Sequence, residues 1–258
     1  ARTDADQDGN LERRVVLNRH QRMVDQGIGT VLTAYFSHSR FILRVDSNDD
    51  GTPERWMAID HTSWVWDPTE DGNADRHRDY LRAVVRKDTN QDGSVDVIRA
   101  LHQNTVQFDN DSNGVIELQW TWRAGVLKVD TDHDGDLDYT AWMHGWHQHW
   151  DWGMVEYHIH RFALTRISDH DTDGIPEWKQ RIIHMSNATD WDFDHHLEQR
   201  ESYTASLTWS DADEDGYEEH IFRRVRETTY LDQHAHGWSH QSESTHSVEI
   251  WRDSNHNL

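Results

Sequence analysis

The chain lacks cysteine altogether and has only three prolines and three lysines among its 258 residues. The absence of cysteine excludes a disulfide framework, a thiol nucleophile and a zinc–thiolate site. No apolar run approaches the roughly 18 residues of a membrane-spanning helix, so we expect no membrane span. Hydrophobic residues make up only 34% of the chain, which is poor for a thick packed core. Bound metal is therefore the main candidate for what holds the fold together.

The chain also has little positive charge: 25 lysines and arginines stand against 48 acids, and the formal net charge is −23. Such a surface offers no basic stripe to neutralise phosphates, so we expect no nucleic-acid partner. The sequence contains no Gly-x-Ser-x-Gly elbow, no His-Glu-x-x-His and no glycine-rich phosphate loop. We therefore predict that the chain is not an enzyme.

What the chain does contain is a nine-residue phrase, Asp-x-Asp/Asn-x-Asp/Asn-Gly-x-x-Asp/Glu, which occurs seven times. The copies begin at Asp4, Asp46, Asp88, Asp109, Asp130, Asp169 and Asp211. Acceptor side chains alternate at positions 1, 3 and 5, glycine permits a sharp turn at position 6, and an acid closes the phrase at position 9. Hard oxygen ligands at this spacing form the cage that Ca²⁺ prefers. The sequence therefore predicts about seven calcium sites, and without metal the clustered carboxylates would repel one another.

The candidate calcium ligands are the residues at positions 1, 3, 5, 7 and 9 of each copy. In chain order they are Asp4, Asp6, Asp8, Asn10, Glu12, Asp46, Asn48, Asp50, Thr52, Glu54, Asp88, Asn90, Asp92, Ser94, Asp96, Asp109, Asp111, Asn113, Val115, Glu117, Asp130, Asp132, Asp134, Asp136, Asp138, Asp169, Asp171, Asp173, Ile175, Glu177, Asp211, Asp213, Asp215, Tyr217 and Glu219. A degraded copy with Thr69 at position 3 adds the candidates Asp67, Asp71 and Asp75.

The phrase differs from an EF-hand loop, which needs a bidentate glutamate at position 12. At that position the seven copies carry Val15, Met57, Arg99, Trp120, Ala141, Gln180 and Phe222. The residues after the loops are rich in aromatic and β-branched types, as in 55–59, and these favour strands over helices. The phrase resembles the calcium loops between β-strands of integrin-type FG-GAP blades and of bacterial extracellular Asp-x-Asp-x-Asp-Gly repeat proteins. This resemblance covers the loops and, through their spacing, the whole chain; it implies an architecture and names no substrate.

The loops fall on a 21-residue grid, since Asp46, Asp67, Asp88, Asp109 and Asp130 are each 21 residues apart. A fixed period of this length is typical of repeat proteins. The intervening sequence favours extended structure, so we predict an all-β fold: an antiparallel β-meander or hairpin repeat array in which each 21-mer is one long strand or a short hairpin. Such an array is similar to RHS/YD-repeat shells, whose Tyr-Asp-x-x-Gly-Arg signature is missing here. The doubled period of 42 leaves a six-bladed β-propeller as the alternative.

We expect residues 1–258 to form a single calcium-binding β-repeat domain. The empty points of the grid resemble turns; they begin at Asp25, Asp151, Asp190 and Asp232. The final phrase, 253–258, stops at position 6 of a loop. We therefore expect either that the chain is a segment of a longer array or that a neighbouring chain completes this site.

Histidine is concentrated in the segment 142–160. Residues i and i+2 of a strand share a face, so His147 with His149, and His158 with His160, would each present two imidazoles together. If the two strands form a hairpin, these side chains converge and could hold Zn²⁺ or Cu²⁺. The alternative interpretation is that histidine fills half-exposed strand positions.

Tryptophan pairs such as Trp64 with Trp66 and Trp120 with Trp122 also lie two residues apart. A solvent-facing row of indoles could stack on sugar rings. The simpler interpretation is that tryptophan supplies buried area in a chain poor in leucine and isoleucine.

Together these features predict an extracellular, calcium-stabilised structural repeat scaffold of a surface layer, filament, adhesin or toxin shell. Calcium loops with weak affinity fill at the millimolar calcium found outside cells, so we expect secretion or display at the cell surface. The expected partners are the protein itself, through head-to-tail or lateral assembly, or cell-surface glycans. The alternative function is a carbohydrate- or transition-metal-binding module that uses the Trp/His-rich segment 142–160.

Overall fold

The computed structural model describes residues 1–4, 11–24, 34–69, 71–151, 155–191, 198–211, 220–233 and 238–251. The elements within these ranges are all β-strands. In chain order they are β1 (Arg2–Thr3), β2 (Arg13–Val24), β3 (Ala34–Val45), β4 (Arg55–Trp66), β5 (Arg76–Lys87), β6 (Val97–Phe108), β7 (Leu118–Val129), β8 (Tyr139–Asp151), β9 (Glu156–Ser168), β10 (Trp178–Asp190), β11 (Gln199–Ser210), β12 (His220–Gln233) and β13 (Trp238–Trp251). Within these ranges, no helix has the length and apolar character needed to cross a membrane.

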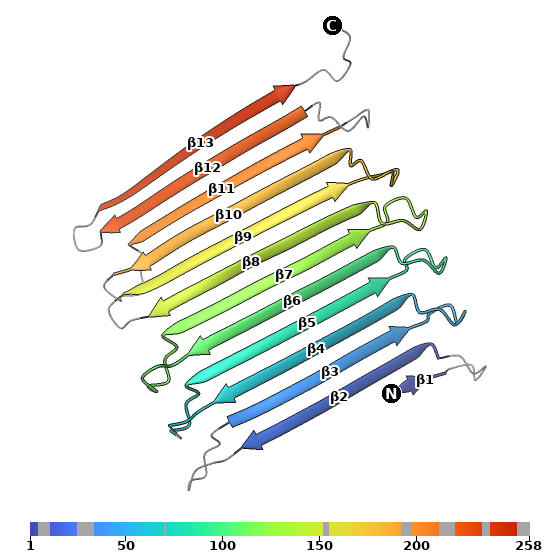
Figure 1. Cartoon of the computed structure of the whole chain (residues 1–258), viewed down its shortest axis with the longest axis horizontal. Coiled ribbons are helices and arrows are strands. Elements are labelled where there is room, and N and C mark those ends of the chain that lie inside the picture. Colours follow the sequence, from blue (N-terminus) through green and yellow to red (C-terminus); the bar gives the residue numbers. More distant parts are fainter. Residues whose placement is uncertain are drawn as a thin grey trace. The chain divides into compact units, whose positions relative to one another are not determined.

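The strands form an antiparallel meander, in which each strand hydrogen-bonds to its neighbours in the chain in the order β1 to β13 (Figure 1). The predicted all-β meander is therefore confirmed, whereas the alternative of separate propeller blades is wrong. Contacts between Cα atoms divide the chain into two compact units, Ala1–Ile116 with Arg123–Thr140, and Glu117–Trp122 with Ala141–Leu258. The expectation of a single domain stays a prediction.

The 21-residue period consists of one strand and one loop. In the first unit β3, β4, β5 and β6 each have 12 residues, and nine residues connect each of them to the next. Because successive strands are antiparallel, consecutive loops lie at opposite ends of the strands. The loops 46–54, 88–96 and 130–138 follow one another at the same end of this unit, where backbone hydrogen bonds join them. The doubled period of 42 thus marks loops at one end of the strands and not propeller blades.

Apolar residues pair across the middle of the first unit. One ladder consists of the direct partners Val16, Ile42, Ala58, Val84 and Ala100. The ladder of the adjacent residues, which point to the opposite face, consists of Leu17, Phe41, Ile59, Ala83 and Leu101. In the second unit Ile183 of β10 similarly lies between Ala163 of β9 and Ala205 of β11. Cross-strand pairs contribute roughly 0.2–1 kcal/mol each to the stability of a sheet, so these pairs stabilise the association of neighbouring strands.

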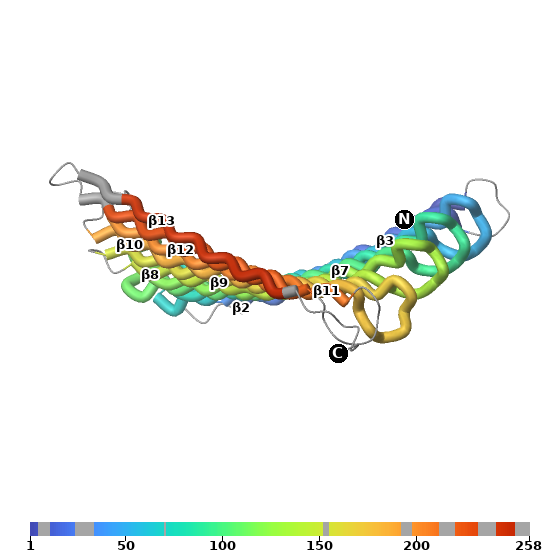
Figure 2. The backbone as a smooth tube through the Cα atoms, turned by 90° about the horizontal axis from the view of Figure 1, so that it is seen from above, coloured from blue at the N-terminus to red at the C-terminus, as the bar shows by residue number. Residues whose placement is uncertain are grey.

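Both faces of the sheet remain accessible to water. In Figure 2 the described strands of each unit lie in one layer, with no second sheet or helix over either face. Among the described apolar side chains only Ala58 and Ala141 are buried, whereas Leu17 is 67% exposed. Trp120 and Trp122 are 45% and 40% exposed, so the interpretation of these indoles as buried is wrong. An apolar core of the usual kind is thus missing from the described ranges.

Candidate metal centres

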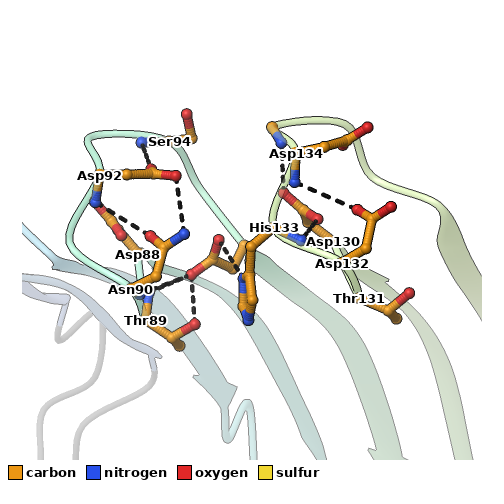
Figure 3. Close-up of polar contacts among 12 residues, drawn as sticks. Asp88, Thr89, Asn90, Asp92, Ser94, Asp130, Thr131, Asp132, His133 and Asp134 are labelled. Atoms are coloured by element: carbon orange, nitrogen blue, oxygen red, sulfur yellow. Dashed lines mark hydrogen bonds and ion pairs between the residues drawn. The ribbon is translucent and has the colours of Figure 1, made fainter.

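Side chains of the nine-residue loops bind the backbone of their own turn. In the loop that begins at Asp88, Asp88 Oδ2 accepts a hydrogen bond from the Gly93 N–H at 2.8 Å. Asp92 Oδ1 accepts one from the Ser94 N–H at 2.7 Å (Figure 3). At position 9 the Asp96 carboxylate accepts hydrogen bonds from the backbone N–H and the hydroxyl at position 2. Short acidic side chains favour such bonds to nearby backbone N–H groups, so the sequence encodes the turn locally.

The same turn recurs in the other described loops. The bond from the position-6 N–H to Oδ2 at position 1 joins Gly51 to Asp46 at 2.9 Å, Gly72 to Asp67 at 3.1 Å, Gly114 to Asp109 at 2.7 Å, Gly135 to Asp130 at 2.9 Å, and Gly174 to Asp169 at 3.2 Å. The position-6 glycines have φ between 87° and 101°, a left-handed backbone that a Cβ atom disfavours. Five residues at position 4 also have a left-handed backbone, with φ of 55° to 65°; they are Asp49, Gln91, Ser112, His133 and Thr172. The sequence predicted the turn at position 6 and gave no signal for position 4.

Carboxylates at positions 1 and 9 are the most buried groups of the loops. Exposures of 8% or less are found for Asp46, Glu54, Asp67, Asp88, Asp96, Asp109, Asp130, Asp138 and Asp211. The side chains at positions 3 and 5, such as Asn48 and Asp50, are exposed. Burial of a carboxylate costs free energy unless a cation or several donors compensate the charge. In these loops the acids at positions 1 and 9 are therefore buried, and the polar side chains at positions 3 and 5 are exposed.

Some of these buried oxygens lack a donor. Among the described residues, neither Asp46 Oδ1 nor Glu54 Oε1 has a hydrogen-bond partner, although Asp46 is 5% and Glu54 8% exposed. One ligand oxygen from each of Asp46, Asp50 and Glu54 lies within 4.8 Å of the others. Unsatisfied buried oxygens are rare in folded proteins, and here they belong to two residues of one group of candidate ligands. A cation held by this group would satisfy them.

The loop that begins at Asp169 shows the repulsion directly. Burial raises the pKa of Asp169 above its usual value, and the negative charges of Glu177, Asp173 and Asp171 raise it further. The Gly174 N–H lowers this pKa but does not offset the other effects. A divalent cation would relieve this repulsion and favour the ionised carboxylate.

Neighbouring loops at the same end of the strands are joined. The N–H at position 1 donates to the carbonyl at position 9 of the preceding loop, as from Asp88 to Glu54 at 2.8 Å and from Asp130 to Asp96 at 2.8 Å. The same bond joins Asp211 to Glu177 at 2.9 Å in the second unit. A change in one loop thus reaches the backbone of the next.

A side-chain contact reinforces one of these links. His133 Nδ1 lies 3.1 Å from Asp96 Oδ1, so position 4 of one loop contacts position 9 of its neighbour (Figure 3). This hydrogen bond raises the pKa of His133, against the effect of burial, and nearby acids add to the increase. Burial alone would raise the pKa of Asp96, but hydrogen bonds from Thr89 and His133 lower it below its usual value. Ser112 similarly donates its hydroxyl to Asp75 at the other end of the strands.

The structure brings part of the predicted ligand set together. Within 4.8 Å lie the ligand atoms of two further sets, Asp130 with Asp132 and Asp138, and Asp169 with Asp171 and Glu177. Seven predicted ligands lie outside the described residues: Asp6, Asp8, Asn10, Asp213, Asp215, Tyr217 and Glu219. At position 7 the Val115 and Ile175 side chains carry no donor oxygen, so only their backbone carbonyls could serve as ligands. The assignment of these groups to calcium stays a prediction.

One acidic loop escaped the sequence analysis. Asp190 is 1% exposed, and Glu198 Oε2 accepts a hydrogen bond from the Trp191 N–H at 2.5 Å. The other loops have the same two features: the acid at position 1 is buried, and the N–H at position 2 donates a hydrogen bond to the acid at position 9. The signal was present in the acids at Asp190, Asp192, Asp194 and Glu198, but His195 replaces the glycine that defined the phrase. Residues 192–197 lie outside the described part of the chain.

The histidines of β8 and β9 converge as predicted. The imidazole rings of His149 and His158 are stacked with their centroids 4.6 Å apart. His160 instead lies beside His184, at 5.9 Å between ring centroids. The sequence has a further group of histidines, His234, His236 and His240, of which His234 and His236 lie outside the described residues.

Comparisons of the chain with models of known protein families, with curated proteins and with solved structures found no match. The fold and the loops therefore define the class of protein by themselves: an antiparallel β-repeat protein with acidic groups that could hold metal ions.

Proposed function

We propose that the chain is a calcium-stabilised structural scaffold that works outside the cell. The observation that carries this proposal is the inverted burial of the fold. Its largest fully buried side chains in the described ranges are Asp96, Asp130 and Asp190, whereas only Ala58 and Ala141 are buried among the apolar residues described. Donors of the turns compensate part of this buried negative charge, and cations would offset the rest.

The donor atoms favour calcium over other cations. The loops offer carboxylate, amide and carbonyl oxygens, which are hard ligands, and no imidazole or sulfur at positions 1, 3, 5 and 9. Calcium accepts six to eight such ligands in flexible geometry, whereas magnesium demands a compact octahedron and retains waters. The resemblance to Asp-x-Asp-x-Asp-Gly repeat proteins supports the same choice, with about seven sites.

The proposed mechanism is mechanical. A calcium ion in a loop neutralises its carboxylates, fixes the nine-residue turn and so sets the register of the two strands that the loop connects. The backbone bond between Asp130 and Asp96 then passes this order to the next loop at the same end. Stability should follow calcium activity, because ligand binding to the folded state adds free energy of RT ln(1 + [Ca²⁺]/Kd) for each site.

The chemistry also supports a location and a partner. Weak calcium sites fill at the millimolar concentrations outside cells. The sheet is an open one, and the unpaired backbone N–H and C=O groups at the edge of an open sheet can pair with the edge of a second copy. We therefore propose lateral self-assembly in a surface layer, filament, adhesin or toxin shell.

Calcium counting by native mass spectrometry tests the metal, and labelling of intact source cells tests the location. We expect several calcium ions to bind, and Glu54→Gln to remove one of them while Glu227→Gln, a strand residue of β12, removes none. Binding of no calcium at millimolar concentration, or a purely internal location, would contradict the proposal.

Exposed tryptophans favour one second candidate, a carbohydrate-binding surface. In the second unit Trp120 and Trp122 share a face of β7, and Trp142 of β8 is 42% exposed. Indole faces of this kind stack on sugar rings. Glycan-array binding that disappears in Trp122→Ala but persists in Trp191→Ala would support this function, and the absence of glycan binding would remove it.

A further inference from the structure

The hairpin of β8 and β9 carries a cluster of nitrogen and oxygen donors that the acidic loops do not explain. His149 lies two residues before the end of β8, and Glu156 and His158 are the first and third residues of β9. The Nε2 atoms of His149 and His158 each lie 2.9 Å from the same oxygen, Glu156 Oε1. The three donor atoms are within 4.8 Å of one another.

The arrangement is not satisfied by hydrogen bonds alone. His158 Nε2 makes a hydrogen bond with Glu156 Oε1. The His149 Nε2 atom is buried and, in the part of the chain that the structure describes, has no hydrogen-bond partner despite its short distance to the carboxylate. The two imidazole planes are nearly parallel, at 11° and 4.6 Å. Two stacked imidazoles whose Nε2 atoms both face one carboxylate oxygen are placed so that they could share one cation.

We propose that His149, Glu156 and His158 bind a divalent transition metal, with Zn²⁺ as the natural ion. Two imidazole nitrogens and one carboxylate oxygen are ligands that Zn²⁺ prefers, whereas Ca²⁺ prefers oxygen alone. Tetrahedral Zn²⁺ with bonds of about 2.0–2.1 Å keeps its ligand atoms about 3.3 Å apart, so the observed contacts need to open by only a few tenths of an ångström. The fourth position is left for water or for His147, whose ring lies 5.9 Å from that of His158.

The place of this cluster in the repeat explains why it differs from the loops. The connection after β8 has only four residues, 152–155, where the grid would place a nine-residue loop. The chain has no room there for acids at positions 3, 5 and 9. The His/Glu cluster therefore stands where an acidic loop is missing and would hold this hairpin with a different ion.

Titration of the tag-free full chain with Co²⁺, in millimolar Ca²⁺ to fill the loops, tests the proposal. We expect one equivalent of Co²⁺ with the visible bands of a four-coordinate ion, displaced by Zn²⁺. His149→Gln, Glu156→Gln and His158→Gln should each weaken binding by about a hundredfold or more. The matched controls His160→Gln and His38→Gln, on β9 and β3, should bind as the parent chain does.

A second measurement does not depend on how the variants fold. X-ray absorption at the zinc edge of the parent protein should show two imidazole nitrogens and one carboxylate oxygen among the ligands. Failure to bind Co²⁺ and Zn²⁺, binding retained in all three cluster variants, or a spectrum with only oxygen ligands would overturn the proposal. None of these results bears on calcium in the acidic loops, so the two proposals fail separately.

Discussion

Asp46→Asn should have opposite consequences with and without calcium. In the parent chain Asp46 Oδ2 accepts a hydrogen bond from the Gly51 N–H at 2.9 Å. The side-chain oxygen of asparagine can accept the same bond in the calcium-free state. The substitution removes a buried charge that lies within 4.8 Å of the Asp50 and Glu54 oxygens. Asp50 is exposed, so the effective dielectric constant approaches that of water, about 80, and relief of the two repulsions is on the order of 1–3 kcal/mol. A buried amide N–H₂ without an acceptor costs about 1–3 kcal/mol, so the two effects nearly cancel.

In calcium the balance changes, because the variant has lost a ligand. A site at a calcium concentration about 100 times its Kd stabilises the fold by about 2.7 kcal/mol. We expect Asp46→Asn to lose most of this amount in calcium and to change stability by less than about 1 kcal/mol in EGTA. The assay is urea unfolding followed by tryptophan fluorescence in both conditions, with hydrogen exchange of the peptide 46–54 as the local readout.

The control for this experiment removes a negative charge outside the loops. Asp60 lies on β4 and forms an ion pair with Arg40 at 3.5 Å. Exposed ion pairs contribute little, so Asp60→Asn should have the same small effect in calcium and in EGTA. Equal destabilisation by Asp46→Asn in both conditions would refute the reasoning, since it would show that this carboxylate supports the turn and not a cation.

Three further predictions concern single residues. The pKa of His133 is raised in the folded protein by its contact with Asp96. This contact therefore stabilises the calcium-free protein at pH values below the ordinary histidine pKa of 6.5. The stabilisation is lost as the pH rises through the pKa of His133 in the folded state. His133→Ala should therefore flatten the pH dependence of urea unfolding in EGTA, and an unchanged profile would contradict the assignment. Gly145→Ala places a Cβ atom 2.8 Å from the Arg161 carbonyl oxygen and should destabilise the second unit by about 1–3 kcal/mol in thermal unfolding. Thr172→Asn should stabilise by about 1 kcal/mol, because a β-branched residue at φ 55° is strained and asparagine tolerates it; a lower unfolding midpoint would be contrary to this account.

The repeat made most of the fold predictable. Acids on alternate residues, glycine at position 6 and 12 extended residues between loops determine one strand and one turn for each 21-mer. The spacing alone did not distinguish a meander from a propeller, because a period of 42 residues fits either two long meander strands or one propeller blade. The exposure of Trp120 and Trp122 was also not predictable, since their position in a strand says nothing about whether a second layer covers it.

The ligand residues of the candidate sites could be predicted from the sequence, whereas the contacts between neighbouring loops could not. The sequence pattern identified Asp46 and Glu54, whereas their burial depends on the preceding and following loops packing against them. The contact of His133 with Asp96 spans 37 residues, and a local pattern does not contain it. The loop that begins at Asp190 was missed because glycine was treated as obligatory at position 6, where His195 occurs.

The most direct test of calcium as the stabilising element is the thermal unfolding midpoint of the full chain as a function of free calcium. The proposed scaffold requires the midpoint to rise steadily with the logarithm of calcium concentration, and to fall in EGTA to a level that magnesium does not restore. The same midpoint in EGTA and in millimolar calcium would contradict it, because the buried carboxylates would then be compensated without the ion.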